Sequence, residues 1–292
     1  MPAVGDVQSR RAMLEPVLAA ANAAQPMPSE VTMTNFEAET GDGAEIVLRW
    51  YHKTGAARGP AAIYMHGGGM ILGSIDLFDG PVARYVSASG VPMLSVDYRR
   101  APEHPHPVPV QDAYTGLTWL ADHVIELGVD PARIAVMGDS AGGGLAAGVA
   151  LLARDPGGPA VSRQILIYPM LDDRNTNPDP ELAPSAFWSY DDNVTGWNAL
   201  LGEAAGGPDV SPYAAPARVA DARGLPAAYI EVGQLDIFRD ESLEYAKRLG
   251  RAGVPVEFHL HPGVPHEFAA NAFATDVARR VVSDRIRVLP AL

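Results

Sequence analysis

The chain contains no cysteine among its 292 residues. A protein without cysteine has no disulfide, no zinc–thiolate site and no thiol nucleophile, so covalent chemistry must use another side chain. Positive charge is also scarce, since 22 Lys and Arg stand against 35 Asp and Glu and give a net charge of −13. Such an acidic protein is a poor partner for the phosphates of nucleic acid or for an anionic membrane. We therefore expect neither as a ligand.

Long uncharged apolar runs are missing as well. No stretch approaches the roughly 18 residues that a membrane-spanning helix needs. Near the N-terminus, Arg10 and Arg11 precede an apolar stretch that loosely resembles a signal peptide. Glu15 and Pro16 interrupt this stretch and leave it shorter than the usual apolar segment of such a peptide. We expect a cytoplasmic protein with no membrane span.

The sequence does contain ample material for a core, because 47% of its residues are hydrophobic and only 20% are charged. Short apolar runs alternate with segments of helical spacing, and this alternation predicts a mostly parallel sheet covered by helices on both faces. A hairpin with strands 31–39 and 45–52 would add an antiparallel edge. The expected strands are 61–65, 91–97, 133–138, 164–168, 228–232 and 256–260, and the expected helices are 7–24, about 110–127, from 141, near 240–252 and near 268–288. Residues 1–292 show no linker and are predicted to form one α/β domain.

Residues from about 172 to 225 fit neither pattern. A connection of about fifty residues is too long for a simple loop in a compact domain. It carries enough aromatic side chains to pack, namely those of Trp188, Tyr190, Trp197 and Tyr213. We predict that this segment, together with residues from about 1 to 30, forms a cap over an active site. The alternative is a disordered surface insertion.

A serine stands between an expected strand and an expected helix. The apolar run from Ile134 ends in Gly138-Asp139-Ser140-Ala141-Gly142, and a segment rich in Ala and Leu follows. A serine between glycines at a strand-to-helix turn is the pattern of a nucleophile elbow, in which the strained turn exposes the hydroxyl. The pattern predicts Ser140 as a catalytic nucleophile.

A serine nucleophile needs a base and an acid that orients the base. In the hydrolase fold that uses this elbow, the three residues follow in the order Ser, Asp or Glu, His, each after its own strand. Asp236 follows the expected strand 228–232, and His266 follows the strand 256–260. Asp240 and Glu241 are better explained as carboxylates in the first turn of the next helix. His259 and His261 belong to the last strand or its exit, so His266 is the predicted base.

The third requirement is a set of donors for the oxyanion. One donor is the N–H of the residue after the nucleophile, here Ala141, and another comes from a glycine-rich loop after an early strand. His66-Gly67-Gly68-Gly69 follows the expected strand 61–65 and fits that loop. A tight turn that merely needs positive φ is the alternative explanation of these glycines.

Five segments together resemble the motif set of the hormone-sensitive-lipase-like esterases, over about residues 60 to 270. The segments are His66–Gly69, Asp97–Glu103, Gly138–Gly143, Asp236–Asp240 and His266–Phe268. The resemblance implies a capped α/β-hydrolase that cleaves small-molecule esters of short to medium acyl chains without a cofactor. It also implies that Gly68 and Gly69 donate to the oxyanion and that His66 shapes the loop. Members often dimerise through the last strand, so a homodimer through strand 256–260 is a further expectation.

The chain departs from the family pattern at three positions. Arg100 stands where Leu is usual, Glu267 where Gly commonly follows the catalytic histidine, and His106 where an aromatic or aliphatic residue is usual. None of these changes removes a catalytic group. A carboxylate at Glu267 would favour the protonated form of His266 and so raise the basicity of its imidazole.

Other chemistries are weaker explanations of the same residues. Gly142–Ala147 fits a dinucleotide fingerprint, but the acidic residue expected about twenty positions later is absent. The pairs His104/His106 and His259/His261 lack a third metal ligand at sensible spacing. We therefore predict no cofactor and no metal. An amidase or arylformamidase would use the same triad, and a non-catalytic receptor on this fold would normally have lost a triad member.

Overall fold

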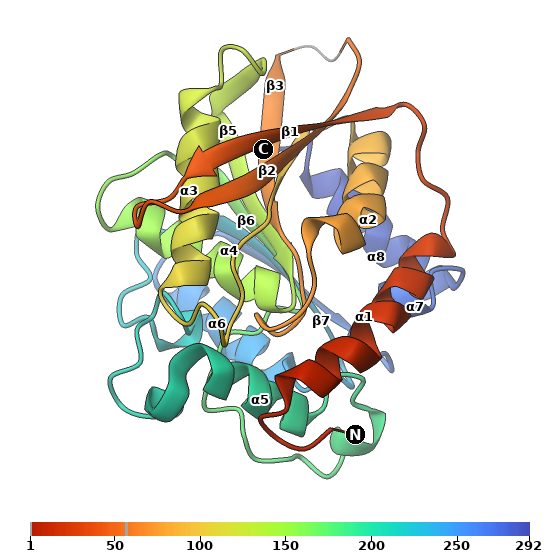
Figure 1. The fold of residues 1–292 in the computed structure, drawn as a ribbon, viewed down its shortest axis with the longest axis vertical. Helices are drawn as coiled ribbons and strands as arrows, with labels where there is room; N and C mark the ends of the chain where they lie inside the picture. Colours follow the sequence, from red (N-terminus) through yellow and green to blue (C-terminus); the bar gives the residue numbers. More distant parts are fainter. Residues whose placement is uncertain (1, 56–57) are drawn as a thin grey trace.

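The computed structural model describes residues 2–55 and 58–292. In this part of the chain, eight strands form one sheet in the order β1-β2-β4-β3-β5-β6-β7-β8 (Figure 1). Strands β3 to β8 run parallel, and β2 pairs antiparallel with both β1 and β4. The bounds are β1 Val31–Glu39, β2 Glu45–Lys53, β3 Gly59–Met65, β4 Met93–Val96, β5 Val129–Asp139, β6 Arg163–Ile167, β7 Ala227–Gly233 and β8 Val256–His261. The predicted parallel sheet with an antiparallel edge is confirmed.

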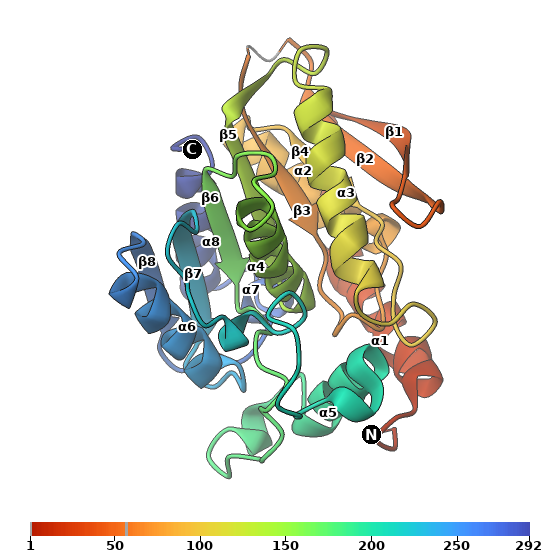
Figure 2. The same ribbon diagram turned by 90° about the vertical axis from the view of Figure 1, so that its left-hand side faces the viewer.

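Helices cover both faces of the sheet (Figure 2). On one face lie α3 (Val108–Asp122), α4 (Ala141–Arg154) and α6 (Arg239–Arg251), and on the other lie α2 (Ile75–Ser89) and α8 (Asp276–Val288). Successive residues of a strand point to opposite faces, so Val136 and Met137 enter the two separate cores. This explains why the central strands are apolar throughout and do not alternate.

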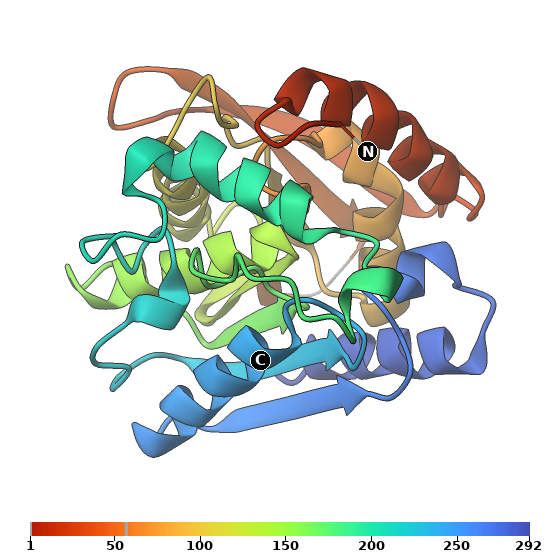
Figure 3. The same cartoon turned by 90° about the horizontal axis from the view of Figure 1, so that it is seen from below.

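Three helices lie at the carboxyl ends of the parallel strands (Figure 3). They are α1 (Val7–Ala23), α5 (Tyr190–Leu201) and the short α7 (Phe268–Asn271). α1 and α5 are joined by a buried ion pair in which Arg10 Nε donates to Asp192 Oδ1 at 2.7 Å. The Arg10 side chain is fully buried, and its Nη1 also donates to the carbonyl oxygen of Ala3 at 2.6 Å.

Two further arginines fasten α1 to the loops beneath it. Arg11 donates to the carbonyl oxygen of Ile71 at 2.6 Å and makes a two-pronged contact with the carboxylate of Glu103. Arg100 donates to the carbonyl oxygen of Gly73 and lies 3.4 Å from a carboxylate oxygen of Glu15. The family departure at Arg100 therefore serves as an anchor for α1.

The structure differs from the sequence-based expectations in three places. α2 was not predicted, although Ser74 accepts from the N–H of Leu77 at its start and Gly90 has φ +72 at its end; Pro81 in its interior masked the helical pattern. The single helix expected near 268–288 is wrong, because residues 272–275 separate α7 from α8 and Thr275 caps α8. Segment 172–225 contains α5, which begins with a capping box at Ser189 and Asp192.

None of the helices in the described residues is long and apolar enough to cross a bilayer.

Candidate active site

Ser140 occupies the sharp turn between β5 and α4. Its backbone has φ 54° and ψ −119°, a conformation that is unfavourable for residues other than glycine. The surrounding structure must therefore hold the turn in place. The N–H of Ser140 donates to the carbonyl oxygen of Ile167, and its carbonyl oxygen accepts from the N–H of Met170, both at 2.9 Å. A Cβ on Gly142 would lie 2.0 Å from the carbonyl oxygen of Met65, so the turn requires glycine there.

The structure brings the three predicted triad residues into one hydrogen-bonded chain. Ser140 Oγ lies 3.0 Å from His266 Nε2, and His266 Nδ1 lies 2.7 Å from Asp236 Oδ2. The other carboxylate oxygen of Asp236 accepts from the N–H of Phe238 at 2.9 Å. With Nδ1–H donating to the carboxylate, Nε2 is free to take the serine proton.

Burial and charge act in opposite directions on His266. Its burial disfavours the imidazolium, but the charge and hydrogen bond of Asp236 outweigh this effect, and Glu267 adds to them. The pKa of His266 is therefore raised above its ordinary value. An imidazole of raised pKa is a stronger base toward a serine hydroxyl.

The glycine-rich loop after β3 is supported by His66. The imidazole is fully buried, and burial lowers the pKa of His66 to about 4, so the ring is neutral. Its Nδ1 lies 2.7 Å from the carbonyl oxygen of Gly67 and donates to it, while the hydroxyl of Tyr98 donates to the carbonyl oxygen of His66 at 2.8 Å. His66 thus fixes the loop and lies outside the triad.

Three backbone N–H groups are available for an oxyanion. Gly68 and Gly69 have φ of +120° and +61°, and in the described part of the chain neither N–H donates a hydrogen bond. Ala141 is the first residue of α4, where the N–H has no partner within the helix and carries the positive end of the helix dipole. These are the groups that the sequence nominated as donors.

The cap segment packs directly onto this loop. A Cβ on Gly69 would lie 2.4 Å from the ring of Trp188, and a Cβ on Gly196 of α5 would lie 2.8 Å from the carbonyl oxygen of Gly69. Trp188 and α5 therefore cover the loop closely.

Unfavourable backbone conformations gather at this site. Among the described residues, the non-glycine positions with positive φ are Met70, Ser140, Tyr168 and Glu267. Met70 follows the glycine loop, Glu267 follows His266, and the ring of Tyr168 meets His266 edge-on with 4.7 Å between centroids. Such strain persists only where the fold holds it, and it is concentrated at functional sites.

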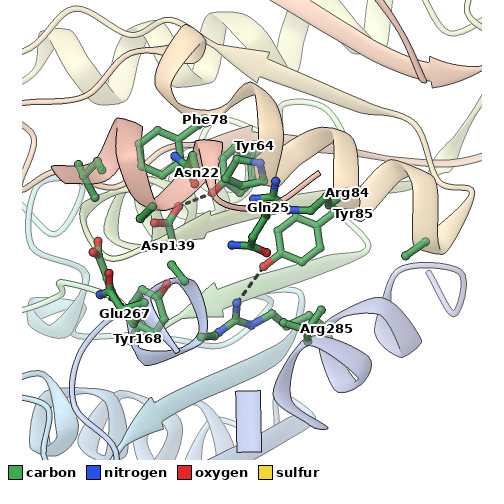
Figure 4. Close-up of a pocket in the computed structure, with 18 of the residues that line it drawn as sticks. Asn22, Gln25, Tyr64, Phe78, Arg84, Tyr85, Asp139, Tyr168, Glu267 and Arg285 are labelled. Carbon is green, nitrogen blue, oxygen red and sulfur yellow. Dashed lines mark hydrogen bonds between the residues drawn. The ribbon is translucent and has the colours of Figure 1, made fainter. Parts of the chain in front are cut away.

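A cavity of about 210 Å³ is lined in part by neighbours of the triad (Figure 4). Its lining includes Asp139 and Glu267, which are next to Ser140 and His266 in the chain, and Tyr168, whose ring contacts His266. The rest of the lining is mainly apolar and comes from α1, α2, α7 and α8, with Gln25 and Tyr64 in addition. Ser140 itself is only 3% exposed, and neither it nor His266 is among the residues that line the cavity.

Two carboxyl groups face this cavity. The hydroxyl of Tyr64 donates to Asp139 Oδ1 at 2.5 Å, and burial raises the pKa of Asp139. Burial also raises the pKa of Glu267 to about 7, and the charges of Asp139 and Asp236 reinforce that rise. The charge of Glu267 is among those that raise the pKa of His266, as hypothesised from the sequence; its effect on rate stays a prediction.

Sequence reasoning missed Trp188 as a contact of the glycine loop, and it missed Tyr64 and Tyr168 as neighbours of the triad. The fixed register between β3 and β5, in which Tyr64 pairs with Met137, places Tyr64 near Asp139. Tyr168 could have been found as the residue directly after an apolar strand, where functional residues of parallel sheets collect.

The residues behind the rejected chemistries have structural explanations. The glycines Gly142, Gly143 and Gly144 let α4 approach the backbone of Met65 and Met170 and the side chain of Pro169. His259 Nε2 contacts the carboxylate of Glu257 at 2.8 Å. Across the described residues, no three His, Asp or Glu side chains come together as a metal site. The N–H of His106 donates to the carbonyl oxygen of Leu200 at 2.9 Å, away from the triad.

Comparison with known proteins gives consistent relatives. Residues 62–270 match a family described by the alpha/beta hydrolase fold. Esterase LipI of Mycobacterium tuberculosis is 40% identical over 222 residues, which cover 74% of this chain and 68% of LipI. Carboxylesterase NlhH of the same species is 40% identical over 230 residues, covering 75% and 69%. The solved structure of a bacterial heroin esterase matches with a TM-score of 0.93 at 36% identity, over 100% of this chain and 94% of that one.

Proposed function

Because this chain belongs to the hormone-sensitive-lipase-like branch of the α/β-hydrolase family and is a carboxylic ester hydrolase, we propose that it works through an acyl-enzyme on Ser140. The observation that carries the proposal is the hydrogen-bonded chain from Asp236 through His266 to Ser140. It ends beside backbone N–H groups that have no partner in the described residues.

In the acylation step, Ser140 Oγ attacks the ester carbonyl carbon while His266 Nε2 takes the hydroxyl proton. Asp236 holds the imidazole with its proton on Nδ1 and stabilises the imidazolium that forms. The tetrahedral intermediate collapses as the carbon–oxygen bond to the alcohol breaks, and His266 gives its proton to the leaving oxygen. Water, activated by the same imidazole, then cleaves the acyl-enzyme.

The oxyanion of the intermediate would be held by the N–H groups of Gly68, Gly69 and Ala141. Both glycines have positive φ and N–H groups without a partner in the described residues, and Ala141 contributes the start of α4. Loss of one such donor typically costs about 2.7–4 kcal/mol of transition-state stabilisation.

We propose further that α1 and segment 172–225 act as the cap and restrict the substrate to short or medium acyl chains. The contacts of Trp188 and Gly196 with Gly69 support this role for the middle of the segment. Its end, at residues 216–218, packs beside α4 and α6, so the covering function belongs to the part before it.

The experiment compares wild type with Ser140→Ala on p-nitrophenyl acetate, butyrate and decanoate. We expect kcat to fall about 10⁴-fold or more in the variant, since a triad without its nucleophile retains only binding and oxyanion effects. Decanoate should be the poorest substrate of wild type. A phosphonate inhibitor should add its mass to the peptide containing Ser140, and a variant that keeps full turnover would end the acyl-enzyme proposal.

A further inference from the structure

Glu267 is a buried carboxyl group with no partner. It is 8% exposed, and its side chain takes part in none of the hydrogen bonds or ion pairs found among the described residues. Its neighbour His266 is already engaged by Asp236 and Ser140. A carboxylate removed from water is costly unless a positive charge or a donor compensates it. Protonated His266 is a favourable charge for Glu267, but while the imidazole is neutral no positive charge or donor in the described residues compensates this carboxylate, so a cationic ligand can bring that charge.

The cavity beside Glu267 has two electrically different ends. Figure 4 shows Asp139 and Glu267 on one side, and Arg84 and Arg285 on the other. Arg285 is neutralised, because its Nε and Nη2 donate to the carboxylate of Glu231. Arg84 has no ion pair in the described residues, and its buried Nη1 has no hydrogen-bond partner. A cationic group in the cavity is therefore drawn toward Glu267 and away from Arg84.

The walls between the two ends are suited to an alkylated cation. The rings of Phe78 and Tyr85 line the cavity together with aliphatic side chains of α1 and α8, whereas the ring of Tyr168 already has the guanidinium of Arg285 over it at 5.6 Å. Aromatic faces attract ammonium groups, and apolar walls accommodate their alkyl substituents. The net charge of −13 adds a long-range attraction for cations.

The position of the cavity tells which part of an ester it receives. The proton that departs with the alcohol comes from His266 Nε2, so the leaving oxygen must lie on the histidine side of Ser140. Glu267 follows His266 in the chain, and Tyr168 meets the His266 ring edge-on. The residues of the glycine loop, which carries oxyanion donors, do not line the cavity. The cavity is accordingly placed for the alcohol portion of the ester.

We propose that this enzyme prefers esters whose leaving alcohol carries an ammonium group close to the ester oxygen, with Glu267 as the residue that recognises the cation. The inference rests on the proposed acyl-enzyme mechanism and adds a substrate class to it. The ester carbon–oxygen bond breaks as described above, and the ammonium group is bound without reacting. A cation on a long spacer reaches the Arg84 end and loses the preference.

The test compares two esters of equal shape, acetylcholine and its neutral carbon analogue 3,3-dimethylbutyl acetate. The ratio of their kcat/KM values cancels any effect of Glu267 on His266, because both esters react at the same triad. We expect wild type to favour acetylcholine about 10-fold or more. Glu267→Gln should bring the ratio close to one. Glu37→Gln removes one exposed negative charge from β1 and should keep the wild-type ratio.

A second Glu267 variant and a neutral substrate complete the test. Glu267→Gly fits the backbone φ of 55° at this position and replaces the glutamine variant if that variant fails to fold. Hydrolysis of p-nitrophenyl acetate by wild type, and its loss in Ser140→Ala, tests the mechanism separately from the preference. The inference is overturned if wild type hydrolyses p-nitrophenyl acetate but does not favour acetylcholine, or if the preference survives in both Glu267 variants.

Discussion

The turn that carries Ser140 is held by backbone contacts, whereas the helices that cover the site, α1 and α5, are held together by charged side chains. The serine turn is fixed by main-chain hydrogen bonds to Ile167 and Met170 and by close packing around Gly142. The covering helices α1 and α5 are joined by Arg10 and Asp192, whose side chains are 0% and 1% exposed. The geometry of the triad and the attachment of the covering helices should therefore respond to different perturbations. Backbone contacts withstand changes of pH and salt, while ion pairs depend on both.

We expect the greatest loss of activity from a change in the triad that leaves the covering helices in place. Asp236→Asn should keep the position of His266 but offer the wrong tautomer to Ser140, and kcat should fall about 10⁴-fold. The cover should be unaffected, so the urea midpoint and tryptophan fluorescence should match wild type. A large loss of stability in this variant would show that the triad and the covering helices are not independent of each other.

The next effect is a loss of stability at the ion pair that joins the covering helices. Arg10→Ala leaves the carboxylate of Asp192 buried without its partner, and we expect the free energy of unfolding to drop by about 3–5 kcal/mol. Urea titration followed by fluorescence measures this loss. Arg223→Ala is the matched control, because Arg223 and Asp221 form an ion pair whose side chains are 78% and 52% exposed. Its removal should cost less than about 1 kcal/mol.

A third effect is the pH dependence of stability caused by Glu267, the residue after the catalytic histidine. Burial raises the pKa of Glu267 from 4.5 to about 7, so the folded protein holds this proton more tightly than the unfolded chain. Wild type should therefore lose stability as pH rises from about 4.5 to 7, by up to about 3 kcal/mol. Glu267→Gln should be more stable than wild type at pH 8 and equal to it near pH 4, as measured by urea titration at both values. A pH-independent difference would contradict the assignment.

The smallest effect concerns a half-exposed anchor of α1. Arg100→Leu restores the residue usual in the family and removes the contact with Glu15, where the two side chains are 33% and 32% exposed. The expected loss is below about 1 kcal/mol and should shrink further in high salt. Thermal unfolding at low and high ionic strength checks it. A loss as large as that of Arg10→Ala would abolish the distinction between buried and exposed anchors.

The contrast between the serine turn and the covering helices also explains which features the sequence could predict. Ser140, Asp236 and His266 each follow an apolar strand, and parallel strands end at one edge of the sheet, so their meeting follows from local patterns. Arg10 and Asp192 lie 182 positions apart, and nothing near either residue indicates the other. Trp188 was recognised as part of a packed segment, but its contact with Gly69 depends on how that segment folds back. α2 was missed for a local reason, namely Pro81, which the helix accommodates.

The pair of Arg10 and Asp192 also sets an order of events during synthesis. A ribosome adds about 5–20 residues per second, so the 182 positions between the partners correspond to about 10–40 s. During that interval the arginine that will be fully buried has no Asp192 with which to pair. The catalytic base emerges later still, at His266. The nascent chain thus receives the partner of its first helix before it can receive the last member of its triad.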